Sequence, residues 1–324
     1  MNWCNFTIQN ASKYTNYTIN DNSLLLKNIK KDRDNIKNLM NNNINITIRE
    51  IENFEEEIDE FANGSFVARE ELYKVKHLLE DNYIVEWQNG FIKINTIKSQ
   101  FLSFEKRVKV LIYIIEYLRI KSKNTNYVKI YLVLSKLEKT FPEDGVMEVE
   151  NANTGYTDFM KNIIFIWRLE EFEKVILHEI IHYFELDDNM KDDKSRIKIQ
   201  GEHRYYEGFT DFWGIYYYII YLSLITKIKI KKLLELELCF IKNQAMQLNS
   251  LLKLNSWEHK PLKTIIQKTA GFSYYIIKYL LFEYSHNNKI INNLKILDTV
   301  LKKGLKQEKY NKIKSARMTL LQIY

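Results

Sequence analysis

The 324-residue chain has little cysteine, proline or glycine, and each shortage excludes a kind of fold. It contains 2 Cys, 2 Pro and 9 Gly. Two cysteines form at most one disulfide, so a small fold held together by several disulfides is excluded. Because glycine and proline are the main turn residues, their scarcity favours long helices over a turn-rich β-sandwich. The length suffices for one large domain or two smaller ones.

Membrane and export signals are also missing from the sequence. The first residues, MNWCNFTIQN, lack a basic segment followed by an apolar stretch, so they do not resemble a signal peptide. The longest apolar run, residues 212–225, is too short to span a bilayer. We therefore expect an intracellular, cytoplasmic protein without a transmembrane segment.

The formal net charge of +7 does not by itself indicate a nucleic acid partner. Lysines are spread along the chain beside abundant Asn, Ile and Tyr, residues with AT-rich codons such as a virus or parasite genome would favour. We therefore expect solvated lysines and no nucleic acid binding. The sequence also lacks a glycine-rich phosphate loop, a Cys-x-x-Cys knuckle and a Gly-x-Ser-x-Gly elbow.

The most informative short motif is HExxH, formed by His178, Glu179 and His182. A helix places residues four apart on one face, so both imidazoles can reach a single ion. Two histidines and a glutamate are costly in a buried helix unless something pairs them, and a divalent cation would do so. HExxH alone also fits a pair of core histidines bonded to neighbours. The apolar residues that predict a buried helix are Phe172, Val175, Ile176, Leu177, Ile180, Ile181, Phe184 and Leu186.

A second pair of candidate residues, Glu207 and Asp211, follows His182 after 24 intervening residues. They are again four apart and share one face of a predicted helix. One carboxylate can complete a metal shell while the other accepts the far N–H of a ligand histidine. Three protein ligands and one open position are what a catalytic zinc site needs.

The combined pattern HEIIHYF…YYEGFTDFW resembles the gluzincin metallopeptidases, in particular the aminopeptidase N and leukotriene-hydrolase group and the bacterial collagenases. The resemblance implies an α+β fold: a thermolysin-like zincin domain with a small sheet, the HExxH helix and a helical C-terminal subdomain. It implies that His178, His182 and Glu207 bind one Zn²⁺ per chain. It further implies that Glu179 is the general base and acid, and that Asp211 orients a histidine.

The rest of the chain predicts helices and strands in the order of a gluzincin catalytic subdomain. Before the HExxH helix we expect a strand at 44–48, a helix at 69–79, a hairpin at 83–87 and 91–94 around Asn89-Gly90, a helix at 104–121, and strands at 127–134, about 145–151 and 163–167. After Asp211 we expect helices at 212–226, 229–253, 262–284 and 290–306. The predicted divisions are an N-terminal accessory region at 1–66, a catalytic subdomain at 67–226 and a helical subdomain at 227–324.

A candidate substrate-binding segment, GVMEVEN, contains Glu148, Glu150 and Asn151. It looks like a stretched form of the GxMEN motif of aminopeptidase N relatives, whose glutamate holds the free amino group of the substrate. Two extra residues separate Met147 from Glu150 and Asn151. Either glutamate can take that role, because alternation along a strand puts both on one face. A solvated acidic edge strand fits the same residues.

A candidate for stabilising the oxyanion is Tyr274, which precedes the run Leu280-Leu281-Phe282. The run resembles the aminopeptidase segment that follows a tyrosine donating to the oxyanion. Tyr275 is adjacent, and His203 and His286 are further candidates. A core or interface position also fits such a tyrosine.

These residues predict a zinc peptidase that hydrolyses peptide bonds with a metal-activated water and acts on a peptide or protein. The altered GxMEN-like motif favours an endopeptidase, with an aminopeptidase of the same clan as the alternative. A catalytically silent, zinc-stabilised structural or interaction protein is the alternative from another class. The presence of Glu179 beside the two histidines argues against it, because a structural zinc site needs no base.

Overall fold

A computed structural model describes most of the chain as a mixed α and β protein. The described residues are 17–64, 67–97, 101–187, 199–201, 204–253, 265–288, 296, 299–300, 305–306 and 308–320. The chain divides into two compact units, each assembled from separate segments. Unit 1 comprises residues 1–31, 139–152 and 187–324, and unit 2 comprises residues 32–138 and 153–186. These divisions differ from the predicted boundaries at 66 and 226.

Unit 2 is built on a six-stranded sheet with strand order β1-β2-β3-β4-β6-β5. The strands are β1 (Ile46–Glu50), β2 (Asp81–Trp87), β3 (Gly90–Thr96), β4 (Val128–Ser135), β5 (Gly155–Asp158) and β6 (Ile163–Arg168). β3, β4 and β6 pair in parallel, whereas β1, β2 and β5 join by antiparallel pairing. β5 is therefore the edge strand beside β6, and β1 brings part of the predicted accessory region into the sheet.

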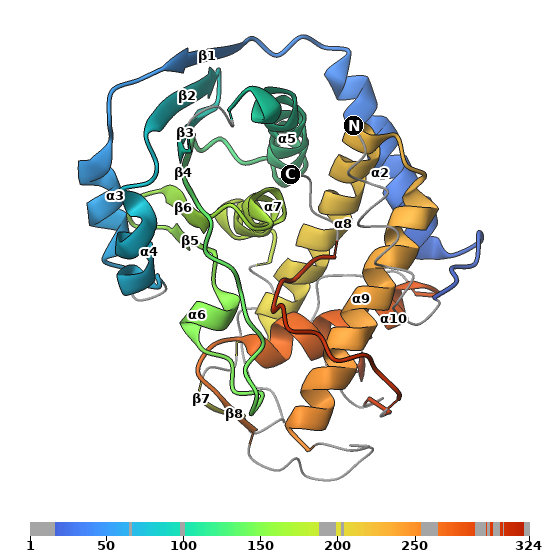
Figure 1. The fold of residues 1–324 in the computed structure, drawn as a ribbon. Helices are drawn as coiled ribbons and strands as arrows, with labels where there is room; N and C mark the ends of the chain where they lie inside the picture. Colours follow the sequence, from blue (N-terminus) through green and yellow to red (C-terminus); the bar gives the residue numbers. More distant parts are fainter. Residues whose placement is uncertain are drawn as a thin grey trace. The chain divides into compact units, whose positions relative to one another are not determined.

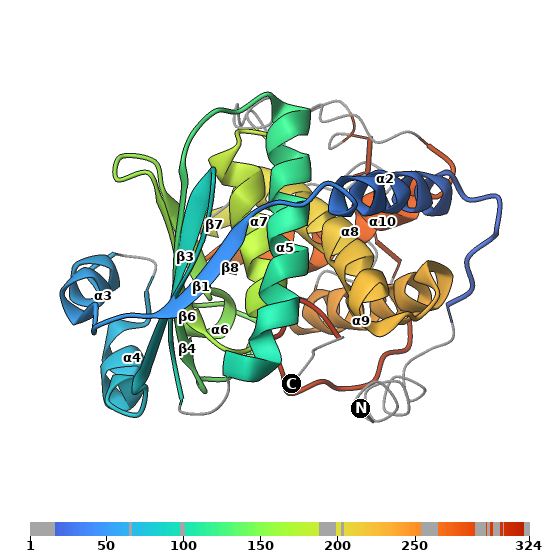
Figure 2. The same cartoon turned by 90° about the horizontal axis from the view of Figure 1, so that it is seen from above.

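Helices cover both faces of this sheet, so unit 2 has three layers (Figures 1 and 2). α3 (Glu55–Ala62) and α4 (Arg69–Lys76) lie on one face. α5 (Phe101–Ser122) and α7 (Phe172–Tyr183), the HExxH helix, lie on the other. The predicted helices at 69–79 and 104–121 and the helix around HExxH are confirmed.

The predicted hairpin is confirmed as β2 and β3, but its turn residues are Gln88 and Asn89, and Gly90 pairs with Trp87 as the first residue of β3. Glycine is required at position 90 for a steric reason. A Cβ on Gly90 would lie 2.5 Å from the Val128 carbonyl oxygen and 2.6 Å from the Trp87 ring. Only glycine allows β4 and the Trp87 ring to approach the turn so closely. The local turn signal and the packing of the sheet therefore require the same residue.

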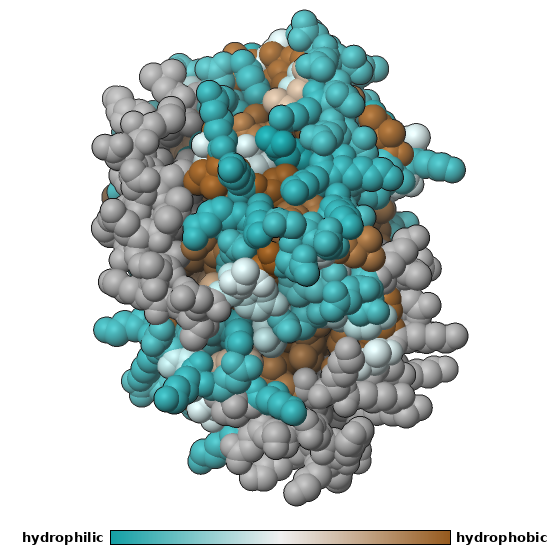
Figure 3. Space-filling model, turned by 90° about the vertical axis from the view of Figure 1, so that its right-hand side faces the viewer, coloured by the Kyte–Doolittle hydropathy of each residue, from teal (hydrophilic) through white to brown (hydrophobic). Residues whose placement is uncertain are grey.

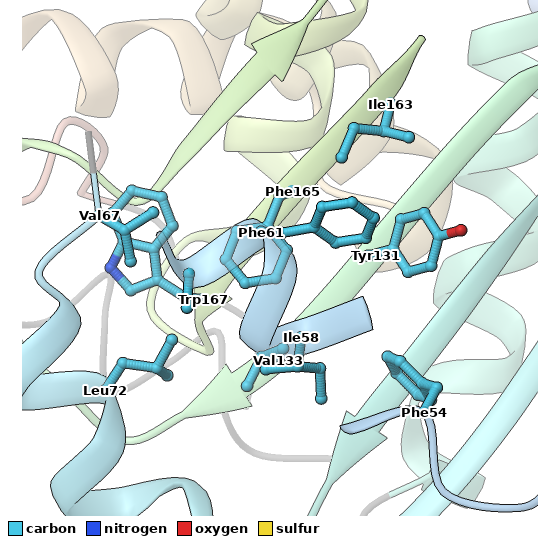
Figure 4. Packing of buried hydrophobic residues seen from close by; sticks show 11 residues of the cluster. Phe54, Ile58, Phe61, Val67, Leu72, Tyr131, Val133, Ile163, Phe165 and Trp167 are labelled. Atoms are coloured by element: carbon cyan, nitrogen blue, oxygen red, sulfur yellow. The ribbon is translucent and has the colours of Figure 1, made fainter. Parts of the chain in front are cut away.

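The sheet face under α3 and α4 carries an aromatic cluster (Figure 4). Figure 4 shows the Phe61 ring next to Phe165 and Tyr131, and their ring centroids lie 5.8 and 4.7 Å from that of Phe61. Burying side chains of this size contributes about 1.5–3 kcal/mol each. The buried members are Phe54, Ile58, Phe61, Ala62, Val67, Leu72, Tyr131, Val133, Ile163, Phe165 and Trp167.

On the opposite face, α5 and α7 are joined by a buried ion pair. Arg107 Nε donates to Glu173 Oε1 over 2.7 Å, and the two side chains are 5% and 1% exposed. Phe104 and Phe172 pack edge to face, with centroids 5.7 Å apart. The guanidinium of Arg107 lies over both rings. These contacts fix α7 in position from its first turn.

Unit 1 is mainly helical, with α8 packed against α9 and α10 (Figure 1). Its elements are α6 (Val149–Ala152), β7 (Ile199–Gly201), α8 (Tyr206–Thr226), α9 (Ile230–Leu251), β8 (Ile265–Gln267), the π-helix η2 (Ser273–Ile277) and α10 (Lys278–Ser285). The remaining helix, α2 (Leu24–Met40), crosses from unit 1 into unit 2. The predicted helices at 212–226 and 229–253 are confirmed, the first beginning earlier, at Tyr206.

One prediction in unit 1 is wrong, a second is wrong in part, and a third lies mostly outside the described residues. Residues 145–151 form no strand: Gly145 has a φ of +77°, and the Asn151 side chain accepts the Glu148 N–H and begins the short helix α6. The predicted helix at 262–284 is wrong in its first part, which contains strand β8 paired in parallel with β7, and correct from 273 to 284, which lie in η2 and α10. Of the predicted helix at 290–306, only 296, 299–300 and 305–306 are described.

The segment before α2 is bonded to the end of α10. The Tyr17 hydroxyl lies 2.9 Å from His286 Nε2, and the Leu24 N–H donates to the His286 carbonyl over 3.0 Å. The Ile19 N–H donates to Glu235 on α9 over 3.2 Å. Early and late parts of the chain thus belong to one packed unit.

The surface on the side of α9 and α10 is mainly hydrophilic, with small hydrophobic patches (Figure 3). None of the described helices combines the length and the apolar character needed to cross a bilayer.

Candidate metal centre

The two histidines of the motif lie on α7, which is buried over its whole length. His178, Glu179 and His182 are 5%, 5% and 8% exposed. The helical spacing puts the two imidazoles on one face, and their ring centroids are 4.9 Å apart. The predicted burial of the motif is confirmed.

The carboxylates of the second motif lie in the first turns of α8. Glu207 is 5% exposed and Asp211 is fully buried. A carboxylate in the first turn of a helix is favoured by the partial positive charge of the helix N-terminus. The chain therefore presents two buried carboxylates one turn apart, as their spacing predicts.

His178, His182 and Glu207 form a buried group that can hold a metal ion. One ligand atom from each residue lies within 4.8 Å of the others. Two nitrogens and a carboxylate oxygen form a donor set of the kind that binds Zn²⁺ at about 2.0–2.2 Å from each ligand.

Glu179 has a hydrogen-bond donor that the sequence analysis did not identify. The Thr157 hydroxyl lies 2.8 Å from Glu179 Oε2 and 3.1 Å from the Glu179 carbonyl oxygen. Thr157 is on the edge strand β5, beside α7. A donor to one carboxylate oxygen fixes the orientation of the group and leaves the other oxygen available.

Asp211 lies beside a buried lysine. Its Oδ2 is 2.7 Å from Lys278 Nζ, and both side chains are fully buried. Lys278 also donates to the Met318 carbonyl oxygen over 3.1 Å. The expected contact between Asp211 and a ligand histidine stays a prediction. Lys278 was not among the predicted site residues, although a single charge within the apolar run 276–282 is a sign of a buried partner.

Tyr274 lies next to the candidate ligand Glu207. Its hydroxyl donates to Glu207 Oε2 over 3.3 Å. Tyr274 belongs to the π-helix η2, a rare widened turn that is frequent at functional sites. The structure therefore brings together Tyr274, chosen from the sequence as an oxyanion donor, and a candidate metal ligand.

The candidate substrate-binding residues have other bonds. Glu148 Oε1 lies 2.5 Å from Lys268 Nζ at the surface, and this bond raises the pKa of Lys268. The Asn151 amide donates to the Thr140 carbonyl and accepts from the Glu148 N–H. Glu150 lies in the first turn of α6. These bonds hold the segment in place.

His203 and His286 are the two further candidates for stabilising the oxyanion. His203 lies outside the described residues. His286 ends α10 and is bonded to Tyr17 and Ser23. Burial lowers the pKa of His286 below its usual value of 6.5.

The comparisons with known proteins found no match: no protein-family model, curated protein or solved structure is similar enough to this chain. The assignment of function therefore depends on the site itself.

Proposed function

We propose that this protein is a zinc peptidase that hydrolyses peptide bonds within a peptide or protein. The observation that carries the proposal is the buried group of His178, His182 and Glu207, with Glu179 next to the first histidine. The resemblance of the two motifs to gluzincins supports the same function. Zinc is the proposed ion because two imidazoles and one carboxylate are the ligand set of many catalytic zinc sites.

When bound, zinc would polarise the scissile carbonyl and lower the pKa of a water towards about 7. Glu179 would take a proton from that water and pass it to the leaving amine. Thr157 would hold the Glu179 carboxylate in the orientation needed for both transfers, through its 2.8 Å hydrogen bond. Tyr274 is the candidate donor to the oxygen that becomes negative, which typically contributes about 3 kcal/mol.

The edge strand β5 offers a way to bind a peptide. Among the described strands it pairs with β6 alone and ends the strand order of the sheet. An extended peptide can add to such an edge through backbone hydrogen bonds. Thr157 lies on this strand, so a peptide added there would run past Glu179.

An endopeptidase is favoured over an aminopeptidase. An aminopeptidase needs an anion that is free to hold the substrate's amino group. Glu148, one of the two candidates, is already paired with Lys268. Peptides with free and acetylated N-termini should therefore be cleaved at similar rates, and loss of cleavage on acetylation would instead indicate an aminopeptidase.

The decisive test combines metal analysis with a peptide library and the variant Glu179→Gln. We expect one zinc per chain in both proteins, and cleavage slower by about 10²–10⁴-fold in the variant. Glu185→Gln is the control, because Glu185 is an exposed glutamate just beyond the same helix. Full activity of Glu179→Gln would exclude its role as the base. Stoichiometric zinc without any cleavage would indicate the structural, catalytically silent alternative.

A further inference from the structure

Tyr274 and Lys278 lie one turn apart and contact two carboxylates that are one turn apart on α8. Tyr274 donates to Glu207 over 3.3 Å, and Lys278 Nζ lies 2.7 Å from Asp211. We propose that Tyr274 is a positioning residue for the metal ligand Glu207, and that the ion pair between Lys278 and Asp211 holds Tyr274 in place to do so. This inference rests on the proposed function, because it takes Glu207 as a ligand.

The helices that carry these residues approach each other unusually closely at Gly208. A Cβ on Gly208 would lie 2.6 Å from Ile277 Cγ2 and 3.0 Å from the Ser273 carbonyl oxygen. The absence of a side chain there lets η2 lie directly against the first turn of α8. Tyr274 can therefore reach Glu207, the residue next to Gly208.

The π-helical turn is part of the same arrangement. The Lys278 N–H bonds the carbonyl of Ser273, five residues earlier, as in a π-helix. Lys278, the residue directly after the π-helix, is also the lysine of the ion pair with Asp211. Lys278 therefore fixes the end of the turn that contains Tyr274.

The complete burial of the ion pair indicates a role in position more than in stability. Removing two charges from water is costly, and a buried pair often adds little net stability over apolar residues of similar volume. Lys278 also bonds the Met318 carbonyl oxygen, so it connects α8, α10 and the segment near 318. Three parts of unit 1 are thereby held around the carboxylates of α8.

Holding Glu207 has a specific chemical effect. A carboxylate side chain on a helix has several rotamers, and each unproductive one lowers the population of the state that can bind metal. A hydrogen bond from Tyr274 to Glu207 Oε2 selects one orientation of the carboxylate. Hydrogen-bond partners of metal ligands typically change affinity by about 10–100-fold when removed.

The test measures the zinc dissociation constant by chelator competition on the full chain, with Tyr274→Phe as the variant. We expect affinity to fall by about 10–100-fold. The d–d absorption bands of the Co²⁺-substituted protein should also shift. An oxyanion donor without a positioning role would lower kcat and leave affinity and spectrum unchanged.

Tyr275→Phe is the matched control. The neighbouring Tyr275 is fully buried and its hydroxyl donates to the Ala316 carbonyl oxygen. This variant loses one hydroxyl from the same helix without touching Glu207, so its zinc affinity should equal that of the wild type. Equal weakening in both variants would reveal general destabilisation and overturn the proposal.

The role of the ion pair is tested in a background without it. Lys278→Met alone removes the lysine from a fully buried carboxylate and is expected to be strongly destabilising, so the double variant Asp211→Asn with Lys278→Met is used. In the double variant Tyr274 is no longer held in place by the ion pair, so adding Tyr274→Phe should change zinc affinity by less than about 3-fold. A smaller effect in this background than in the wild type is the expected sign of coupling between the two contacts. An undiminished effect of Tyr274→Phe would overturn the role of the pair.

The outcomes separate this inference from the proposed function. If the wild type binds no zinc, both are wrong. If it binds zinc and cleaves peptides while Tyr274→Phe has wild-type affinity and spectrum, only the positioning role is wrong.

Discussion

Replacing Gly208 by alanine tests whether the close approach of η2 to α8 is required. The added Cβ would lie 2.6 and 2.9 Å from two Ile277 side-chain atoms and 3.0 Å from the Ser273 carbonyl oxygen. Distances below 3.0 Å are too short for carbon atoms, so the helices must move apart. The Ser273 oxygen belongs to the backbone and cannot move alone.

The expected size of the effect follows from two opposing terms. Alanine is favoured over glycine within a helix by about 1 kcal/mol. Overpacking a buried site typically costs about 1–3 kcal/mol, and contact with backbone favours the upper part of that range. We therefore expect Gly208→Ala to lower the free energy of unfolding by about 1–2 kcal/mol.

Urea denaturation measures this change, and zinc affinity provides a second measurement. Moving η2 by a few tenths of an ångström lengthens the 3.3 Å bond between Tyr274 and Glu207, so metal affinity should fall as well. An Ile277→Ala background removes the nearest crowding atom, Ile277 Cγ2, while its Cβ remains, and the cost of Gly208→Ala should shrink by about 1 kcal/mol. A Gly208→Ala protein at least as stable as the wild type would refute the reasoning.

Three further predictions concern separate contacts. Arg107→Met should cost about 3–5 kcal/mol in chemical denaturation because the buried Glu173 carboxylate loses its arginine, and adding Glu173→Gln should recover most of it; an unchanged single variant would contradict this. Thr157→Val should lower kcat by about 10–100-fold with zinc affinity unchanged, since a hydrogen bond to the charged Glu179 is worth about 1.5–3 kcal/mol; a wild-type kcat would show that the contact is unimportant. Burial lowers the pKa of His286 in the folded state, so the unfolded chain binds a proton at this residue more readily than the folded chain does. The contribution of His286 to the free energy of unfolding is therefore complete above pH 6.5 and decreases as the pH falls below that value. Unfolding midpoints between about pH 7 and 5 should show this loss, and His286→Gln should reduce the slope.

The elements that the sequence predicted well are those with strong local signals. The hairpin is marked by an Asn-Gly pair between two apolar runs, and the structure needs this glycine for packing at the start of β3. The helix around His178 is marked by apolar residues on all sides, and it is buried throughout. At such positions the local pattern and the tertiary contacts favour the same conformation.

The elements that were missed depend on partners far away in the sequence. β7 and β8 have three residues each and pair Ile199 with Ile265, so neither has a periodic pattern long enough to identify it. At 145–151 the alternation of Val and Glu suggested a strand, yet a side-chain bond from Asn151 favours a helical turn. The segment's backbone is instead bonded just after β8, where the Lys268 N–H donates to the Met147 carbonyl.

The sequence could predict those residues of the candidate site that lie one helical turn apart on the same helix. His178 and His182, and likewise Glu207 and Asp211, follow this spacing. Thr157 could not be identified, because a threonine on a short edge strand has no distinctive sequence context. Its contact with Glu179 arises only from the packing of β5 beside α7.

The separate segments of unit 1 have a consequence for biosynthesis. Unit 2 has its last residue, 186, well before the chain is complete, so a ribosome can release everything it needs while translation continues. Tyr17 and Ile19 are synthesised well before Glu235 and His286, the partners that they contact in the folded protein. The segment around these two residues therefore stays available to chaperones longer than unit 2.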